Sequence, residues 1–493
     1  MPSILGANTL SSGYDVANSC RFNDGSSDHM LIAPSSAGNK QTWTWSAWVK
    51  RGVLGTRQVL FSGYDQAAGL GESIEFTSGD LLEYDLDIAG TDFTVTSSMV
   101  FRDVSAWYHI LFIKDVTEST ETNRIKVYVN GVQIALVENA NGYPAENATN
   151  GLINAAGNYE HHVGCLVPNS SFFDGYMCEV VFIDGTAQTN TDFGEFDSDS
   201  GIWKPIDVSG LTFGTNGFYF EFKGSGTSAN SSGLGADTSG NDHHFTVTNL
   251  TAVDQTTDTC TNNFMTLNPL ITLTSRTDNQ VYSEGNTVVI PNSTDNYGTA
   301  FGTFGATRGK WYWEAKIIWN GTENNANYPR TIGFMRDDYA FNQSTLGQNA
   351  DNSWGVGFAD LDTDGWGLDH NGSFSAITGA TTLANNKMVM FALDLDNGKF
   401  YMGYDGTFFT SGDPTSGATG TGAIATLDAT DLSFNIIPAL TNATNVTYYQ
   451  MNFGNPAYAI ASSNADGDGF GNFEFAVPSG YFSWCSKNLA EYG

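Results

Sequence analysis

The sequence predicts an all-β protein with two antiparallel β-sandwich domains of the jelly-roll type, joined by a connector rich in Gly, Ser and Asn. Short runs of alternating aromatic and β-branched residues recur along the chain, and clusters of Gly, Asn, Asp and Ser separate them. Almost no segment shows the periodicity of an amphipathic helix. Many short strands linked by turns favour sandwiches over an α/β sheet. At about 150 residues per domain, the 493 residues agree with two or three domains.

Five runs are the clearest predicted strands. They are TWTWSAWVK at 42–50, WYHILFI at 107–113, IKVYV at 125–129, KWYWEAKII at 310–318 and MVMFALDL at 388–395.

Shifts in composition divide the chain into four segments. Residues 1–17 contain no basic residue, and we expect an N-terminal arm that needs a partner to become ordered. Residues 18–193 and 271–493 are rich in predicted strands and form the two domains, the second with a C-terminal tail. Residues 194–270 include the run GSGTSANSSGLGADTSGNDHH at 224–244, and we expect a connector with a short strand pair around GFYFEF at 217–222 and a flexible loop.

The charge balance excludes two classes of partner. Twenty Lys and Arg residues against 53 Asp and Glu residues give a net charge of −33, and the basic residues are scattered. Because phosphates are bound by clustered Lys and Arg, we expect no nucleic acid and no anionic membrane surface as a partner. No apolar run approaches the 18 or so residues of a membrane span, and the N-terminus lacks the features of a secretory signal. The five cysteines form no CxxC motif, so neither a zinc module nor a full disulfide framework is indicated.

Three segments of the first domain carry a family resemblance. SAWYHILFIKD at 105–115 is followed by RIKVYVNGVQI at 124–134, in which Asn130 and Gly131 supply the two positive φ angles of a type I′ turn. With FFDGYMCEVVFIDG at 172–185, these segments resemble the laminin-G/pentraxin branch of concanavalin A-like lectins. The resemblance implies a lectin-like jelly roll over most of 18–193.

The second domain resembles the SPRY fold, a bent sandwich of two antiparallel sheets. GKWYWEAKI at 309–317 is similar to its opening strand, and IGFMRDD at 332–338 to the strand after it. SWGVGF at 353–358 looks like a central strand, and MVMFALDLDNGKFYMGYDGTFF at 388–409 matches its long hairpin.

The combination of these domains, a polar N-terminal arm and the closing PSGYFSWCSKNL at 478–489 resembles bacteriophage virion proteins of the tail-fibre or capsid-decoration type. This resemblance implies a non-enzymatic structural protein of the virion that binds a host-surface glycan and contacts other virion proteins through the arm. It also implies a homo-oligomer, for which a trimer is one option. A purely structural cement or spacer protein is the alternative, and a polysaccharide depolymerase is a less favoured one.

One acidic strand motif raises the question of catalysis. The alternation of a strand places Glu83, Asp85 and Asp87 on one face. The motif is similar to that of laminarinase-type glycosidases, but Asp87 replaces the acid/base Glu and the extra residue expected before it is missing. We therefore predict no catalytic residue. The alternative role is an acidic strand edge that discourages aggregation.

Asp360, Asp362 and Asp364 have the DxDxDG spacing of calcium loops, followed by a Gly that permits the sharp turn. The twelfth position is Asn371, so an EF-hand is absent. We predict Ca²⁺ at this loop as the one candidate cofactor, since a cation would relieve the self-repulsion of an acidic chain. An acidic surface loop without a metal is the alternative.

The resemblance to SPRY domains implies that a ligand binds on loops at one end of that sandwich, around 320–330 and 336–352. Arg330 and Arg336 lie there in an otherwise acidic chain, and exposed aromatic rings could stack on sugars. The predicted ligand-binding residues are Arg330, Arg336, Tyr328, Tyr339 and Trp366. Loop aromatics such as Tyr64 in the first domain offer the same chemistry, although aromatic residues also build sandwich cores.

Overall fold

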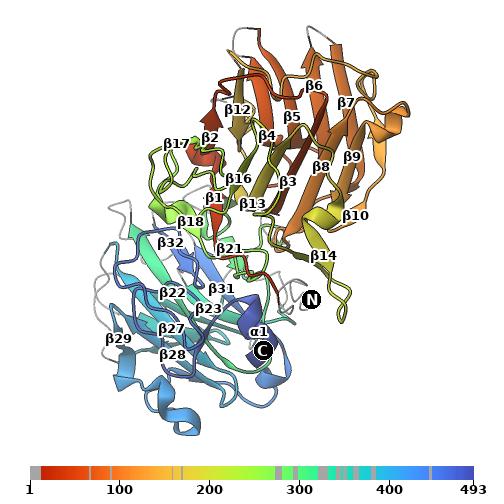
Figure 1. Ribbon diagram of the computed structural model, residues 1–493. Coiled ribbons are helices and arrows are strands. Elements are labelled where there is room, and N and C mark those ends of the chain that lie inside the picture. The colour runs from red at the N-terminus through yellow and green to blue at the C-terminus, as the bar shows by residue number, and fades with distance from the viewer. Residues whose placement is uncertain are drawn as a thin grey trace. The chain divides into compact units, whose positions relative to one another are not determined.

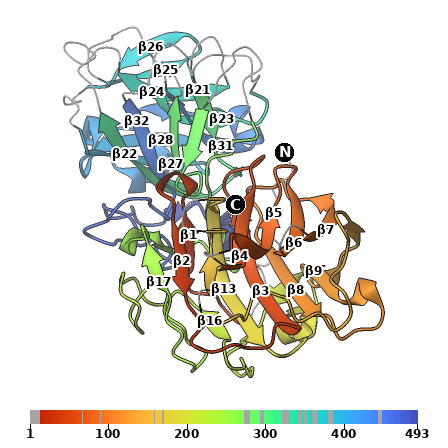
Figure 2. The same ribbon diagram turned by 90° about the horizontal axis from the view of Figure 1, so that it is seen from above.

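In the computed structural model most regular elements are strands, and they form antiparallel sheets, apart from the parallel pairing of β33 (Phe482–Ser483) with β22 (Lys310–Trp319) (Figures 1 and 2). The prediction of an all-β protein is confirmed. The structure describes residues 13–65, 68–88, 91–157, 159–167, 170–271, 280–291, 298–319, 331–339, 346–347, 352–358, 366–378, 385–442 and 447–493.

The chain divides into two compact units. The first unit spans Gly6–Asn263 and Ser283–Gly285, and the second spans Phe264–Tyr282 and Asn286–Gly493. Within the described residues, no helix is long and apolar enough to cross a membrane.

The first unit consists mainly of two sheets that enclose one core. In spatial order, one sheet contains β10 (Val132–Gln133), β9 (Ile125–Val129), β8 (Tyr108–Asp115), β3 (Thr42–Arg51), β13 (Gly175–Asp184), β1 (Ser19–Phe22) and β18 (Gln255–Thr256), with β16 (Phe218–Phe220) also paired to β13. The other contains β11 (Leu136–Glu138), β7 (Thr91–Val100), β6 (Leu81–Ile88), β5 (Leu70–Phe76), β4 (Gln58–Asp65), β12 (Tyr159–Val163), β2 (His29–Ile32) and β17 (Thr246–Thr248). A small separate sheet pairs β14 (Gly194–Phe196) with β15 (Trp203–Pro205).

Alternation along β3 shows how the sequence builds this core. Trp43 and Trp45 point between the sheets, where the Trp45 ring stacks on Phe61 with centroids 6.3 Å apart. Trp48 belongs to a smaller cluster on the opposite face of the strand. At the end of β9, Asn130 and Gly131 have φ angles of 48° and 78°, as the predicted type I′ turn requires.

Residues 194–263 are part of the first unit, and this corrects the predicted connector. Strands β16, β17 and β18 pair with β13, β2 and β1, and the side chains of Phe218 and Phe245 are completely buried in the core. The Gly- and Ser-rich composition reflects the turns between these strands. The strands themselves are only two or three residues long, too short to show a period.

The predicted arm is described only from residue 13 onward. Val16 is buried and its N–H donates to Thr261 Oγ1 at 3.0 Å. The Tyr14 hydroxyl lies 3.2 Å from the Tyr219 hydroxyl. Residues 13–17 therefore lie against the first unit, while residues 1–12 are outside the described part of the chain.

The second unit also contains two sheets. One has the order β19 (Gln280–Ser283), β20 (Val288–Pro291), β32 (Thr447–Asn452), β22 (Lys310–Trp319), β27 (Met388–Asp394), β28 (Lys399–Tyr404) and β29 (Thr407–Phe408), with β30 (Ala425–Thr426) paired to β28 and β33 (Phe482–Ser483) to β22. The other has the order β21 (Gly298–Phe301), β31 (Ile436–Asn442), β23 (Thr331–Arg336), β24 (Ser353–Phe358), β25 (Trp366–His370) and β26 (Ser373–Ala376). Trp313 on β22 stacks on Phe391 of β27 at 5.1 Å in the core, and the helix α1 (Ser486–Tyr492) lies near the C-terminus (Figure 1).

Candidate functional site

The predicted residue Arg336 is fully engaged within the protein. Its guanidinium donates two hydrogen bonds to Asp338, at 3.0 and 2.6 Å, and one to Asp431 at 3.0 Å. It also lies over the ring of Phe434, with 4.2 Å between the guanidinium carbon and the ring centroid. The side chain is buried, so it holds its own loops together and has little left to offer a ligand.

Tyr339 and Trp366 are buried as well, each with 2% of its surface exposed. A ring that stacks on a sugar must present a face to solvent, so the structure corrects the exposed role predicted for these two residues. The strand register also places two of the predicted ligand-binding residues, Trp366 and Arg336, far from each other. Trp366 pairs with Phe358 at the end of β24, whereas Arg336 lies at the other end of that sheet, where its N–H donates to the carbonyl of Asn352, just before β24 begins.

The remaining predicted residues lie outside the described part of the chain. They are Tyr328, Arg330, Asp360, Asp362 and Asp364. Among the residues that are described, no group of three or more His, Cys, Asp or Glu side chains could hold a metal ion. The calcium loop therefore stays a prediction.

The acidic strand motif lies on β6 in the first unit. Tyr84 and Leu86 are buried in the core, and Glu83, Asp85 and Asp87 alternate with them and are half-buried on the outer side of the sheet. The predicted common face is confirmed. Neighbouring strands add further side chains to it, and we define the outer acidic face as Arg57, Tyr64, Glu75, Glu83, Asp85 and Asp87.

Arg57 neutralises part of this face. Its Nε lies 2.5 Å from Glu75 Oε1 and its Nη2 lies 2.7 Å from Oε2, a two-pronged ion pair. The same Nη2 is 3.6 Å from Asp85 Oδ2. Ser73 donates a further hydrogen bond to Glu75, so that carboxylate is well satisfied although it is buried.

Glu83 and Asp85 keep their protons to unusually high pH. Partial burial, followed by repulsion from Glu75 and from Asp85, raises the pKa of Glu83 to about 7. Burial and the charge of Glu75 raise the pKa of Asp85 to about 6, despite a hydrogen bond from Thr94. A protonated carboxyl donates as well as accepts hydrogen bonds, which suits a ligand that carries hydroxyl groups.

Tyr64 brings an aromatic ring to the same face. It lies on β4 directly opposite Gly71 of β5. A Cβ at Gly71 would lie 3.1 Å from Leu166 Cδ1 and 3.4 Å from Tyr64 Cδ2, so the absence of a side chain there leaves room for the Leu166 side chain beside the half-buried ring. Because Glu72 of β5 pairs with Leu86 of β6, the next residues along, Gly71 and Asp87, lie opposite each other. Tyr64, Gly71 and Asp87 therefore form one row across the three strands. Asp87 Oδ1 is buried and has no hydrogen-bond partner among the described residues, while the side chain as a whole is half-buried.

Sequence reasoning found the three acids of β6 but missed their neighbours. Tyr64 was expected on a loop and lies on a strand, and Arg57 and Glu75 carried no local signal. Only the pairing of β4 with β5 and of β5 with β6 brings these residues together.

Comparison with known proteins supports the reading of the first unit. Residues 24–190 match the Laminin_G_3 family model, described as the concanavalin A-like lectin/glucanases superfamily. The predicted lectin-like domain is confirmed for this segment. No curated protein matches the chain.

Three solved structures resemble parts of the chain. The SPRY domain of human HERC1 is 15% identical over 33% of this chain and 86% of its own, with a TM-score of 0.24. The native heptameric SAP-like pentraxin from Limulus polyphemus is 13% identical over 36% of this chain and 81% of its own, with a TM-score of 0.27. Stonustoxin is 14% identical over 38% of this chain and 28% of its own, with a TM-score of 0.25.

Proposed function

We propose that this protein is a non-enzymatic carbohydrate-binding protein whose first unit holds saccharides on the outer acidic face. The observation that carries the proposal is the half-buried Tyr64 ring on the same face of the sheet as the half-buried carboxyl groups of β6. A ring can stack on the apolar side of a sugar, and carboxyl groups beside it can form hydrogen bonds with the sugar hydroxyls. The lectin/glucanase superfamily match over 24–190 supports the same ligand class.

Binding to an array of neutral and acidic glycans by the purified full chain tests this proposal. Wild-type protein should bind at least one glycan, and Tyr64→Ala or Asp87→Asn should weaken that binding tenfold or more. Phe196→Ala is the matched control, because Phe196 is a half-exposed aromatic of the same unit on the separate β14–β15 sheet. A wild-type protein that binds no glycan would favour the structural cement or spacer role instead.

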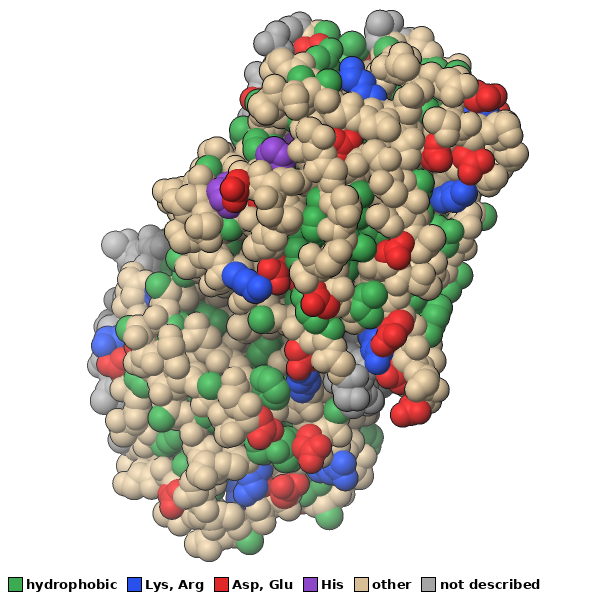
Figure 3. Space-filling model, viewed as in Figure 1, with side chains coloured by type: hydrophobic (Ala, Val, Ile, Leu, Met, Phe, Trp, Pro, Cys, Tyr) green, Lys and Arg blue, Asp and Glu red, His purple; other side chains and the backbone are tan. Residues whose placement is uncertain are grey.

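The finer part of the proposal is that a bacteriophage displays this protein as a tail-fibre or capsid-decoration protein and uses it to bind a host-surface glycan. It rests on the resemblance of the domain combination to virion proteins. On the face of the molecule in Figure 3, Lys and Arg side chains are scattered among acidic ones and form no basic patch, which suits a neutral ligand better than a phosphate-rich one.

Virion assembly can be tested through the arm. We propose that residues 1–17 contact other virion proteins and that the displayed form is a homo-oligomer. Deleting residues 1–12 should leave a folded protein that no longer joins the particle, as measured by its copy number in purified virions. Normal incorporation of the shortened chain would contradict this role for the arm.

Polysaccharide hydrolysis is a second candidate, favoured by one observation. The pKa of about 7 for Glu83 would let this residue act as a proton donor. Against it, Asp87 stands where laminarinase-type glycosidases have the acid/base Glu, and the extra residue expected before it is missing. Release of reducing ends from a host polysaccharide, abolished by Glu83→Gln, would establish this activity.

Calcium at Asp360, Asp362 and Asp364 is a separate proposal, based on their spacing. Thermal unfolding with and without EDTA tests it, and an unchanged midpoint would remove it.

A further inference from the structure

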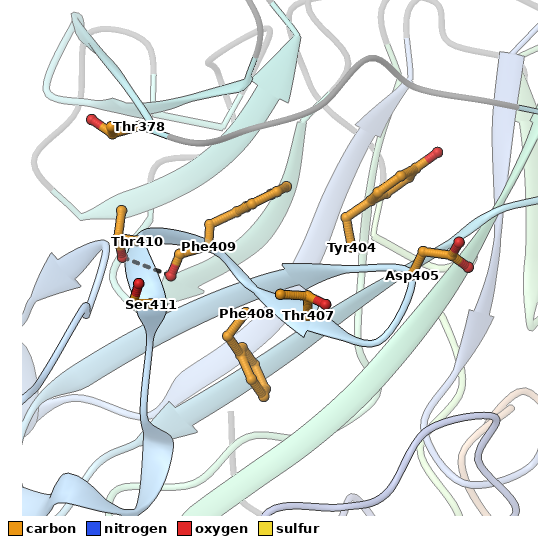
Figure 4. Close-up of a pocket in the computed structure, with 8 residues that line it drawn as sticks. All are labelled: Thr378, Tyr404, Asp405, Thr407, Phe408, Phe409, Thr410 and Ser411. Atoms are coloured by element: carbon orange, nitrogen blue, oxygen red, sulfur yellow. Dashed lines mark hydrogen bonds between the residues drawn. The ribbon is translucent and has the colours of Figure 1, made fainter.

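A pocket of about 880 Å³ opens in the second unit, where β28 ends and the chain turns through β29 into a short 3-10 helix at Phe409–Ser411 (Figure 4). This volume is within the range of small-molecule sites. None of the residues predicted from the sequence lines the pocket, although the buried Trp366 lies behind it.

A tight turn builds one side of the pocket. Asp405 and Gly406 have φ angles of 49° and 89°, and the two residues that flank them, Tyr404 and Thr407, pair across the turn. Two further residues with hydroxyl groups, Thr410 and Ser411, both have a φ of 54°. This left-handed conformation is costly for residues other than Gly, and such strain gathers at functional sites.

Two aromatic rings form an apolar wall. Figure 4 shows the rings of Tyr404 and Phe409 on the same side of the β28–β29 segment, while Phe408 points the opposite way. The centroid of Trp366 lies 6.0 Å from that of Tyr404 and 5.7 Å from that of Phe409. The wall is therefore held in place from behind by a buried ring, and Tyr404 remains half-exposed.

Apart from Phe408, the rest of the lining is polar. Thr407 and Ser411 are exposed, and neither hydroxyl makes a hydrogen bond to another described residue. Asp405 is the one charged side chain in the described lining, and Lys387 lies 2.5 Å from its carboxylate. The lining thus offers hydroxyl groups and a partly neutralised carboxylate beside an apolar wall.

We propose that this pocket binds a neutral hexopyranose unit of a glycan. A pyranose has an apolar face, which fits the Tyr404 and Phe409 wall, and a rim of hydroxyl groups, which fits Thr407, Ser411 and Asp405. An anionic ligand is disfavoured by Asp405 and by the net charge of −33. A cation is disfavoured because Lys387 already occupies the carboxylate. This second binding site lies on a different unit from the outer acidic face and does not depend on it.

Saturation-transfer NMR on the full chain tests the pocket, with the methyl glycosides of glucose, galactose, mannose and N-acetylglucosamine as probes at millimolar concentration. We expect at least one glycoside to bind. In the Tyr64→Ala background, which removes binding at the outer acidic face, Tyr404→Ala should weaken the remaining binding tenfold or more, and Thr407→Val, which replaces a hydroxyl with a methyl group of similar size, about threefold. Phe196→Ala should leave it unchanged.

Two outcomes would contradict the proposal that this pocket binds a hexopyranose: no glycoside binds the wild-type chain, or Tyr64→Ala alone abolishes all binding. If instead Tyr404→Ala alone abolishes it, the pocket stands and the outer acidic face fails as a site. A signal that remains in Tyr64→Ala and disappears in the double variant Tyr64→Ala/Tyr404→Ala supports both binding sites. The unfolding midpoint checks each variant, and if Tyr404→Ala fails to fold, Asp405→Asn and Thr407→Val decide the result.

Discussion

Glu72 shows how much a single buried residue holds together in the first unit. One carboxylate oxygen accepts hydrogen bonds from Lys114 at 2.5 Å and Tyr84 at 2.8 Å, and the other accepts from the backbone N–H groups of Leu152 and Ile153. Lys114 comes from β8 and Glu72 from β5, so this ion pair joins the two sheets across the core.

Breaking that ion pair should be costly. Lys114→Met leaves the Glu72 charge buried without its cation, and we expect the free energy of unfolding of the first unit to fall by about 3–5 kcal/mol. The double variant Lys114→Met/Glu72→Gln should recover part of the loss. Urea denaturation measures both. Lys126→Met is the control, since Lys126 is partly exposed and its pair with Glu118 spans 3.7 Å. Equal effects at both lysines would contradict this account.

Glu83 should make stability depend on pH. Its pKa rises from 4.5 to about 7 in the folded protein, chiefly through burial, so the folded state binds the proton more tightly than the unfolded chain. Stability therefore falls as pH rises from about 4.5 to about 7. Glu83→Gln should raise the free energy of unfolding by roughly 1 kcal/mol above pH 7, after allowance for solvent screening, and have little effect at pH 4.

Urea denaturation at a series of pH values measures the effect of Glu83→Gln. Glu121→Gln, at an exposed position, serves as the control and should leave the pH profile unchanged. A uniform shift at every pH in Glu83→Gln would mean that packing, not the charge, causes the change.

Among the strands, those with long alternating runs were predicted closely and the shortest ones were not. Runs expected at 42–50 and 310–318 form β3 (Thr42–Arg51) and β22 (Lys310–Trp319). A strand was predicted at 217–222, where β16 lies, but within a connector; β17 and β18 were not predicted, because two or three residues cannot display a period of two. Their place in the sheets depends on pairing with strands far away in the sequence.

Strand β16 should therefore matter to the core of the first unit. Phe218 is completely buried and packs at 4.7 Å on Phe220 and 4.8 Å on Phe245, measured between ring centroids. Phe218→Ala should lower the free energy of unfolding by about 3–5 kcal/mol, because it removes buried apolar surface and leaves a cavity. Phe196→Ala, at an exposed ring, should change it by less than about 1 kcal/mol. If both variants lost a similar free energy of unfolding, the interpretation of residues 194–263 as a connector would be favoured instead.

At the scale of the whole molecule, the family match and the folding unit differ in extent. The match covers residues 24–190, whereas the first unit spans Gly6–Asn263 and Ser283–Gly285. Arg21 explains part of this difference. Its fully buried guanidinium forms ion pairs with Asp254 and Glu284, both at 3.3 Å, and all three residues lie outside the matched segment but inside the first unit.

Fragments test this extent directly. A fragment of residues 6–285 should unfold in one cooperative transition, because it contains every strand of both main sheets and both partners of Arg21. A fragment of residues 18–193 lacks β16, β17 and β18, so the core side chains that these strands cover would be exposed to solvent. We therefore expect it to aggregate or to unfold without cooperativity. Thermal denaturation followed by circular dichroism compares them, and a cooperative 18–193 fragment would contradict the assignment.

The sequence by itself determined the all-β class, the long strands, the turn at Asn130 and the shared face of Glu83, Asp85 and Asp87. Each of these follows from alternation or turn chemistry between neighbouring residues. Only the tertiary structure placed Arg57 and Tyr64 beside those acids, buried Trp366, and formed the pocket at Tyr404. These features depend on strand register, which joins residues distant in sequence and leaves no local pattern to read.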